Sequence, residues 1–145
     1  MLRTILVLSA FLLLTALPLT GSAQHPFGDY VIHHGTMLTS NLDPEVARQY
    51  DIQRSDHRGL VTVAVRKNIK GGDKAVRADV RATGINLSAQ RRELAMREVD
   101  EGDAIYYLAD FRIDPPETVR LEIHVTPEGT EEEHTFEVSR RFHSE

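Results

Sequence analysis

The chain lacks cysteine and tryptophan altogether, and its aromatic residues are five Phe and four Tyr among 145 residues. Without cysteine there can be no disulfide, no thiolate metal site and no cysteine nucleophile. Basic residues are also in the minority, with 17 Lys and Arg against 22 Asp and Glu, so the formal net charge is -5. An acidic chain does not look like a nucleic-acid binder. At this length we expect one domain.

The first 23 residues have the pattern of a secretory signal peptide. A basic start at Arg3 precedes an apolar stretch over 5–14, Pro18 follows, and small residues end the segment at Ala23. The apolar stretch is shorter than the ~20 residues that a membrane span needs. We therefore expect a signal peptide over 1–23, cleaved after Ala23, and an exported mature protein over 24–145 with no stable membrane span.

The rest of the chain alternates with a period of two, which is typical of strands with one buried face. Seven short segments have this character, separated by turn residues every 8–12 positions. They are 27–38, 60–65, 76–82, 94–99, 105–113, 119–125 and 136–138. The pattern predicts an all-β fold, a single antiparallel β-sandwich of about seven strands, with a closed barrel as the alternative.

One short helix is expected over 43–50. Asp43 can accept a hydrogen bond as the N-cap, and Pro44 suits the first helical position because its missing N–H would have no partner there. Turns are expected at 70–73, where two glycines favour a hairpin, at Glu101-Gly102, and at 126–129.

The segment 101–109, EGDAIYYLA, resembles the end of the sandwich in immunoglobulin variable domains. In that family an acidic turn, an alanine, an apolar residue and two tyrosines precede a cysteine, and Leu108 stands at the cysteine position here. The resemblance implies an immunoglobulin-like sandwich in which Tyr106 is the tyrosine-corner residue, whose hydroxyl would bind a nearby backbone group.

A second resemblance covers the whole mature chain. It rests on the order and spacing of FGDY at 27–30, LDPEVA at 42–47, YDIQRS at 50–55, EGDAIYYLA at 101–109 and Phe142. These elements are similar to an exported Gram-negative family known as domain-of-unknown-function family 4426. The resemblance implies a periplasmic single-domain β protein and carries no catalytic residues across.

Charge is distributed unevenly along the chain. Residues 48–97 hold 12 basic and 5 acidic residues, whereas residues 98–145 hold 4 basic and 14 acidic ones. One interpretation is a basic patch that binds an envelope protein or an anionic envelope component. Its candidate residues are Arg66, Lys67, Lys70, Lys74, Arg77 and Arg81. The other interpretation is neutralisation between neighbouring strands, since opposite cross-strand charges contribute only ~0.2–1 kcal/mol each.

Seven histidines raise the possibility of a transition-metal carrier, with His33, His34 and His124 as candidate ligands. However, adjacent residues on a strand point to opposite faces, so His33 and His34 should not share one metal. No helical pair of histidines is present in the sequence, and a zinc site needs three or four converging ligands. The sequence therefore favours dispersed surface histidines, with no cofactor expected.

Catalysis ranks last among the functions considered. The tripeptide Ser55-Asp56-His57 has triad residue types but cannot have triad geometry within one loop. A glycosidase would need two carboxyls ~5–10 Å apart across a sugar cleft, and the acids here fall mostly in turns. We expect a non-catalytic binding or structural module for an envelope component, with a small-ligand or metal carrier second and a hydrolase third.

Overall fold

The computed structural model describes residues 23–144. The predicted signal peptide lies outside these residues except for Ala23, its last residue. Within the described part, no helix is long and apolar enough to cross a membrane.

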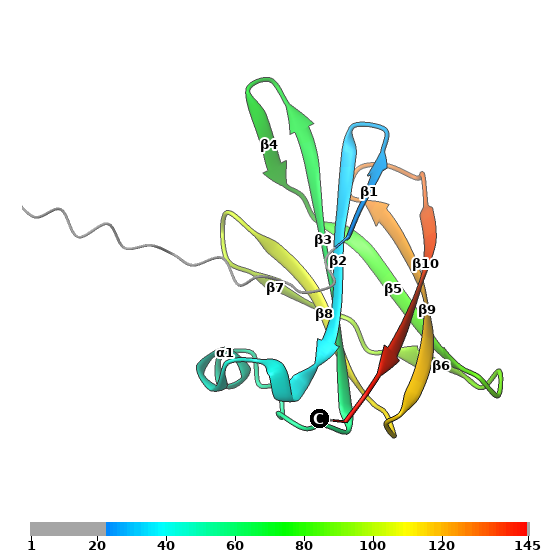
Figure 1. Ribbon diagram of the computed structural model, residues 1–145. Coiled ribbons are helices and arrows are strands. Elements are labelled where there is room, and N and C mark those ends of the chain that lie inside the picture. The colour runs from blue at the N-terminus through cyan, green and yellow to red at the C-terminus, as the bar shows by residue number, and fades with distance from the viewer. Residues whose placement is uncertain (1–22, 145) are drawn as a thin grey trace, which may run out of the picture.

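Two antiparallel sheets face each other and form a sandwich (Figure 1). The first sheet has the order β1–β2–β3–β8–β7, and β4 also pairs with β3; the second has the order β10–β9–β5–β6. Strands of the first sheet are β1 (Ala23–Phe27), β2 (Tyr30–Leu38), β3 (Arg58–Ile69), β4 (Gly72–Ala75), β7 (Arg97–Asp100) and β8 (Ile105–Arg112). Strands of the second are β5 (Ala78–Asn86), β6 (Arg91–Leu94), β9 (Glu117–Pro127) and β10 (His134–Phe142). The predicted antiparallel sandwich is confirmed.

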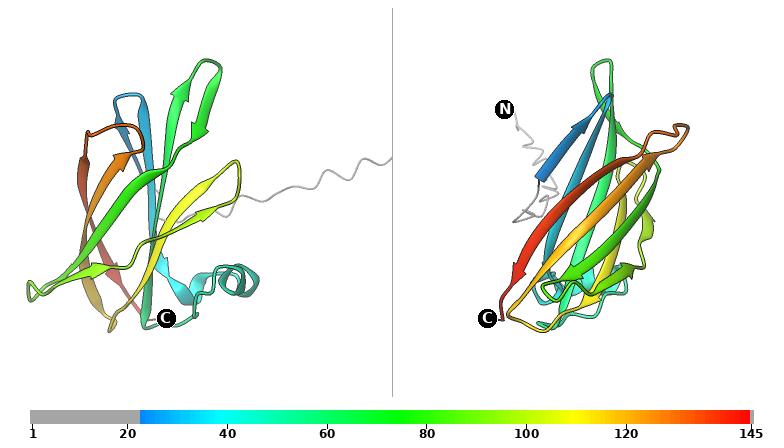
Figure 2. Two further views of the ribbon diagram at one scale, coloured as in Figure 1. Left: turned by 180° about the vertical axis from the view of Figure 1, so that it is seen from behind. Right: turned by 90° about the vertical axis from the view of Figure 1, so that its right-hand side faces the viewer.

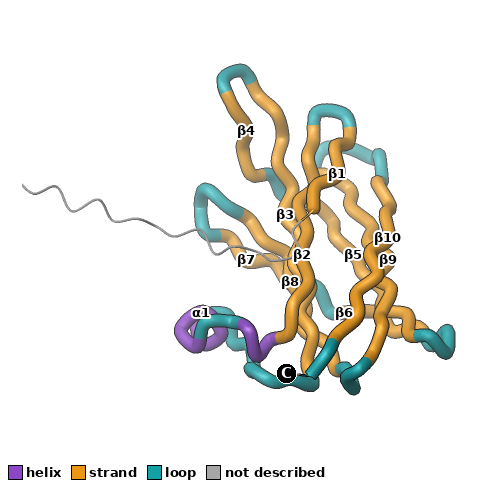
Figure 3. The backbone as a smooth tube through the Cα atoms, in the orientation of Figure 1, coloured by secondary structure: helices purple, strands orange, loops and turns teal. Residues whose placement is uncertain are grey.

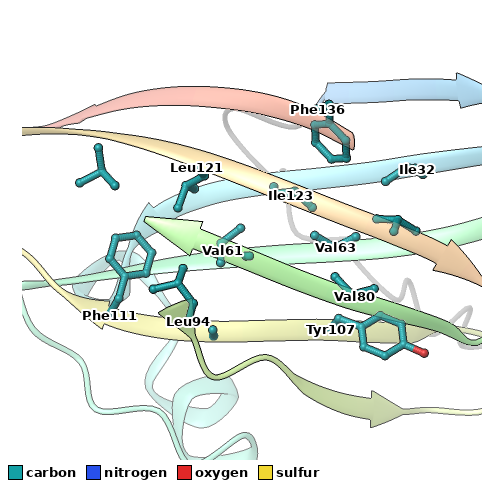
Figure 4. Close-up of a cluster of buried hydrophobic side chains, with 14 of the residues drawn as sticks. Ile32, Val61, Val63, Val80, Leu94, Tyr107, Phe111, Leu121, Ile123 and Phe136 are labelled. Atoms are coloured by element: carbon teal, nitrogen blue, oxygen red, sulfur yellow. The ribbon is translucent and has the colours of Figure 1, made fainter. Parts of the chain in front are cut away.

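The core lies between the sheets and is built from alternate residues of each strand. Val61, Val63 and Val65 of β3 face the other sheet and are wholly buried. Leu121, Ile123 and Val125 of β9 meet them from the opposite side and are also wholly buried (Figure 4). Branched aliphatic side chains at every second position suit the pleated, half-buried surface of a strand.

A second, smaller cluster covers the outer face of the first sheet. Helix α1 (Pro44–Gln49) follows a 3-10 turn, η1 (Thr39–Asn41), and its Ala47 packs against Leu60 and Leu108. The helix begins as predicted: the Asp43 side chain accepts a hydrogen bond from the Glu45 amide at 2.8 Å, and Pro44 is the first helical residue. Figure 3 shows the helix beside the C-terminal end of β2, away from the second sheet.

The strand count is the main difference from expectation, because residues 23–144 form ten strands, whereas about seven were expected. Most of the predicted stretch 27–38 is the single strand β2, but Phe27 ends the preceding strand β1, and a turn at Gly28 and Asp29 joins the two strands into a hairpin. The predicted strand 94–99 is two short strands in different sheets, β6 and β7, joined by a crossing at Ala95 and Met96. Figure 2 shows that the β3–β4 hairpin extends beyond the body of the sandwich.

Candidate functional site

The β1–β2 hairpin places two histidines on its inner face. In its register Ala23 pairs with His34 and His25 pairs with Ile32, so these four residues share one side of the hairpin. Ile32 is wholly buried in the core, which shows that this side faces the other sheet. His33 pairs with Gln24 and points the other way, as the sequence analysis expected.

Strand β10 supplies a third histidine from the second sheet. His134 pairs with Val125 and Phe136 pairs with Ile123 of β9, and both partners belong to the core. His134 and Phe136 therefore face the gap between the sheets, opposite the β1–β2 hairpin. Figure 1 shows β1 and β10 running near each other at this edge of the sandwich.

The three histidines meet at this edge, and we call His25, His34 and His134 the histidine cluster. The Nε2 atoms of His25 and His34 lie 3.1 Å apart. The ring centroids of His25 and His34 are 5.0 Å apart, and those of His25 and His134 are 6.2 Å apart. Phe136 stacks on His25 with centroids 4.3 Å apart, and Phe27 stacks on His134 at 4.9 Å. Two aromatic rings therefore stack on the cluster, in which His34 is buried and His25 and His134 are part-exposed.

The cluster also holds polar atoms that lack partners. His34 is 95% buried, and its Nδ1 has no hydrogen-bond partner; the buried Nε2 of His134 has none either. Within residues 23–144, these two are the buried side-chain nitrogen or oxygen atoms that have no hydrogen-bond partner. An unpaired buried polar atom costs ~1–3 kcal/mol, so each one calls for an explanation.

Burial lowers the pKa of His34 below its ordinary value, and the nearby His25 lowers it further. The imidazole is therefore held in its neutral form, which carries a lone pair and is the form that binds metals.

These distances are compatible with a shared metal ion. Two imidazole nitrogens bound at ~2.0–2.1 Å with a tetrahedral angle stand ~3.3 Å apart, close to the observed 3.1 Å. Their ring centroids would then stand ~5 Å apart, or ~6.3 Å if the two bonds were collinear. Within residues 23–144, no three His, Asp or Glu side chains are already gathered closely enough to form a ready ligand shell. The structure thus offers a facing pair, with a third ring beside it.

The other predicted metal candidates lie elsewhere. His124, on β9, is part-exposed and contacts Glu133 at 2.9 Å, with the Thr135 hydroxyl 3.1 Å away. Neither His33 nor His124 belongs to the histidine cluster. The sequence analysis named His34 as a metal candidate and did not name His25 or His134.

The predicted basic patch is largely paired internally where it consists of arginines. Arg66 binds Asp73 at 2.9 Å, Arg77 binds Glu98 and Asp100, and Arg81 binds Glu133. These contacts are the neutralisation between strands that the sequence analysis described. Lys67 lies 5.8 Å from the centre of the Tyr30 ring, and Lys70 and Lys74 are exposed near the tip of the β3–β4 hairpin.

A neighbouring tyrosine makes the contact that was predicted for Tyr106. The Tyr107 hydroxyl accepts a hydrogen bond from the Ala78 amide at 2.9 Å and donates to Glu98 at 3.3 Å. Tyr107 is buried, whereas Tyr106 is part-exposed on the opposite face of β8. Burial is the main reason that the pKa of Tyr107 is raised.

A separate hollow of about 510 Å³ lies between β5, β6, β8 and β9. Its apolar lining includes Gly84, Leu94, Phe111 and Val119, and its polar lining includes Arg112. None of the predicted binding residues lines this hollow.

Comparison with known proteins places the chain in a family. The family model "Domain of unknown function (DUF4426)" matches residues 24–145. A solved DUF4426 family protein from Pseudomonas aeruginosa PAO1 is 31% identical, with a TM-score of 0.72 over 86% of this chain and 97% of that one. The chain belongs to the DUF4426 family. The predicted membership is confirmed. Among the curated proteins, none matches the sequence.

Two more distant structures share the fold alone. A copper-bound variant of FetP from uropathogenic Escherichia coli strain F11 is 7% identical, with a TM-score of 0.58 over 84% of this chain and 95% of that one. FetP as isolated from the same strain is 10% identical, with a TM-score of 0.51 over 84% and 92%.

Proposed function

We propose that this DUF4426 protein is an exported, non-catalytic binding module that holds a transition-metal ion in the histidine cluster. The observation that carries the proposal is the 3.1 Å approach of His25 Nε2 to His34 Nε2, with His134 alongside. Imidazole nitrogen suits copper, zinc, iron and nickel ions. The copper bound to the FetP variant shows only that this fold is compatible with metal binding, since the low identity transfers no ligand.

A hydrogen bond between the two rings would account for the 3.1 Å distance alone. It would not account for the buried Nε2 of His134, which has no hydrogen-bond partner. This atom lies in the histidine cluster, and a metal ion gives it an acceptor for its lone pair. Burial lowers the pKa of His34, which reduces the competition of protons with a metal ion for its nitrogen.

The test is metal binding by the protein purified without a tag. The variant His34→Phe removes one ligand and places another aromatic ring beside Phe136, so the fold should tolerate it. The matched control His33→Phe makes the same change one residue away, on the opposite face of β2. We expect one ion per chain in the wild type and in the control, and less than a tenth of that occupancy in His34→Phe. Equal occupancy in all three proteins would contradict the proposal.

A second candidate function is docking of an anionic envelope protein or component on the β3–β4 hairpin. The observation that favours it is the projection of this hairpin, with Lys67, Lys70 and Lys74 near its tip and Ile69 46% exposed. Reversing the charge of the three lysines should abolish partner capture from an envelope extract. The control reverses Arg140 and Arg141 on β10, and unchanged capture by the lysine variant would refute this candidate.

A further inference from the structure

We infer that the histidine cluster selects a monovalent d10 ion, Cu(I) or its analogue Ag(I), over the divalent ions Zn(II) and Cu(II). This inference rests on the proposed function and names the class of ion that the site takes. Three features of the cluster lead to it: the charge of its donors, their number, and the aromatic rings that stack on them.

The donors are neutral. His25, His34 and His134 bring no negative charge, so a bound ion keeps its full charge within the site. The cost of transferring an ion out of water rises with the square of its charge, so a divalent ion loses about four times as much solvation as a monovalent ion of the same size. Partial burial of the cluster therefore acts against Zn(II) and Cu(II) far more than against Cu(I).

The number of donors points in the same direction. Zn(II) is bound by four ligands in structural sites, and Cu(II) prefers a square-planar or tetragonal set. The facing pair His25 and His34 provides two nitrogens 3.1 Å apart, and the His134 ring lies beside them, its centroid 6.2 Å from that of His25. Cu(I), Ag(I) and Zn(II) all have a filled d shell, but a monovalent ion accepts as few as two nitrogen donors, whereas Zn(II) takes four ligands, of which water can be one.

The surrounding rings favour a soft cation. Phe136 lies 4.3 Å from the His25 ring and 5.0 Å from the His34 ring, centroid to centroid. Phe27 stacks on the third ring, His134. An aromatic face attracts a cation within ~6 Å of its centroid, and this attraction grows once water has been displaced.

The experiment titrates the untagged full chain with Ag(I), Zn(II) and Cu(II) in chloride-free buffer, using isothermal calorimetry and competition between ions. Ag(I) is the probe because it stays monovalent without a reductant. We expect one Ag(I) per chain, bound at least tenfold more tightly than Zn(II) or Cu(II). The affinity should be unchanged in His33→Phe and fall at least 100-fold in His34→Phe. The nitrogen NMR signals of His25 and His34 should shift on saturation.

The outcomes separate the two claims. If Zn(II) or Cu(II) binds as tightly as Ag(I), and His34→Phe abolishes that binding, the selectivity is refuted and the metal site stands. If no ion shows binding that depends on His34, the metal site itself is refuted and the selectivity with it. Silver binding that persists in His34→Phe belongs to other residues and also refutes the site. The variant His134→Phe separates two donors from three, because only a three-donor site would lose affinity.

Discussion

The substitution Gly59→Ala gives a sharp test of how tightly the lower end of the sandwich is packed. Gly59 lies on β3, directly opposite Phe111 of β8 in the strand register. A Cβ atom at this position would stand 2.8 Å from Phe111 Cζ, 2.9 Å from Phe111 Cε2 and 3.1 Å from Phe142 Cζ. These approaches are closer than carbon atoms tolerate, so at least one ring must move.

Both rings are buried, and Phe111 also lines the hollow of about 510 Å³ described above. Phe111 is 4% exposed and Phe142 is 2% exposed, and they meet edge to face with centroids 5.9 Å apart. Overpacking a dense core by one methyl group costs ~1–3 kcal/mol. Against this, alanine restricts the unfolded chain more than glycine does, which contributes ~0.4–1 kcal/mol to stability. The expected net loss is about 1–2 kcal/mol in the free energy of unfolding.

Gly84→Ala is the matched control on β5. Its Cβ would stand 3.6 Å from Val119 Cγ1 and 3.7 Å from Leu94 Cδ2, which is ordinary van der Waals contact. Gly84 is buried as well, so the two variants differ mainly in what the new methyl group meets. The control should gain ~0.4–1 kcal/mol from the unfolded state alone.

Urea unfolding followed by circular dichroism measures both effects. With a urea dependence of ~2 kcal/mol/M, the midpoint for Gly59→Ala should fall by ~0.5–1 M, and that for Gly84→Ala should rise slightly. A Gly59→Ala midpoint at or above the wild-type value would refute the reasoning, because it would show that the two phenylalanines can shift without cost.

Three further predictions concern single polar side chains. Tyr107→Phe leaves the Ala78 amide without its 2.9 Å acceptor and should lower the free energy of unfolding by ~1–3 kcal/mol, measured as a lower urea midpoint. Asp43→Ala removes the N-cap of α1 and should lower the free energy of unfolding by ~0.5–2 kcal/mol. Hydrogen exchange should become faster at the Glu45 amide, which donates to Asp43 in the wild type. Burial, and next the hydrogen bond to Glu101, raise the pKa of Tyr50 to about 12 in the folded protein. In the unfolded chain the pKa of a tyrosine is ~10, so between these two pH values the phenol is neutral in the folded state and ionised in the unfolded one. The contribution of Tyr50 to the free energy of unfolding is therefore fully present below pH ~10 and is lost as the pH rises to about 12. Over that pH range the thermal unfolding midpoint should fall less steeply in Tyr50→Phe than in the wild type.

The central strands could be predicted because apolar residues recur at every second position, in step with the alternation of buried and exposed positions along a strand. In β9, Val119, Leu121, Ile123 and Val125 are buried, as the period of two required. In β3 the run starting at Leu60 is apolar on both faces, and the structure shows why: Leu60 packs under the helix on the outer face. The Asp43-Pro44 pair marked the helix start because capping depends on neighbouring residues alone.

The edges could not be predicted in the same way. Strands β6 and β7 have four residues each and belong to different sheets, so neither is long enough to display a period. The turn at Gly28 and Asp29 carried a usable signal, since Gly28 has a φ of +56° that favours glycine. Recognising that turn would have ended one strand at Phe27 and begun another at Tyr30. Pairing the two strands then places His25 on the same face of the hairpin as His34.

The third histidine needed the tertiary structure. His134 continues the alternation of Phe136 and Val138, which was enough to predict an inward-facing side chain on β10. The approach of β10 to the β1–β2 hairpin depends on how the two sheets stack, and no local pattern specifies that. Likewise, the choice between Tyr106 and Tyr107 for the backbone contact depends on which face of β8 meets the core.

Stability alone does not explain the histidine cluster. At positions 34 and 134 the alternation calls for apolar side chains, and neighbouring inward positions such as Ile32 and Phe136 have them. Histidine there leaves buried nitrogens without partners, which costs folding free energy that leucine or phenylalanine would not. Violations of the packing pattern are expected where a protein binds something. Of the two unsatisfied nitrogens, His134 Nε2 is the one that a metal ion joining β1, β2 and β10 would use, because the facing pair presents Nε2 of His34 and not its Nδ1.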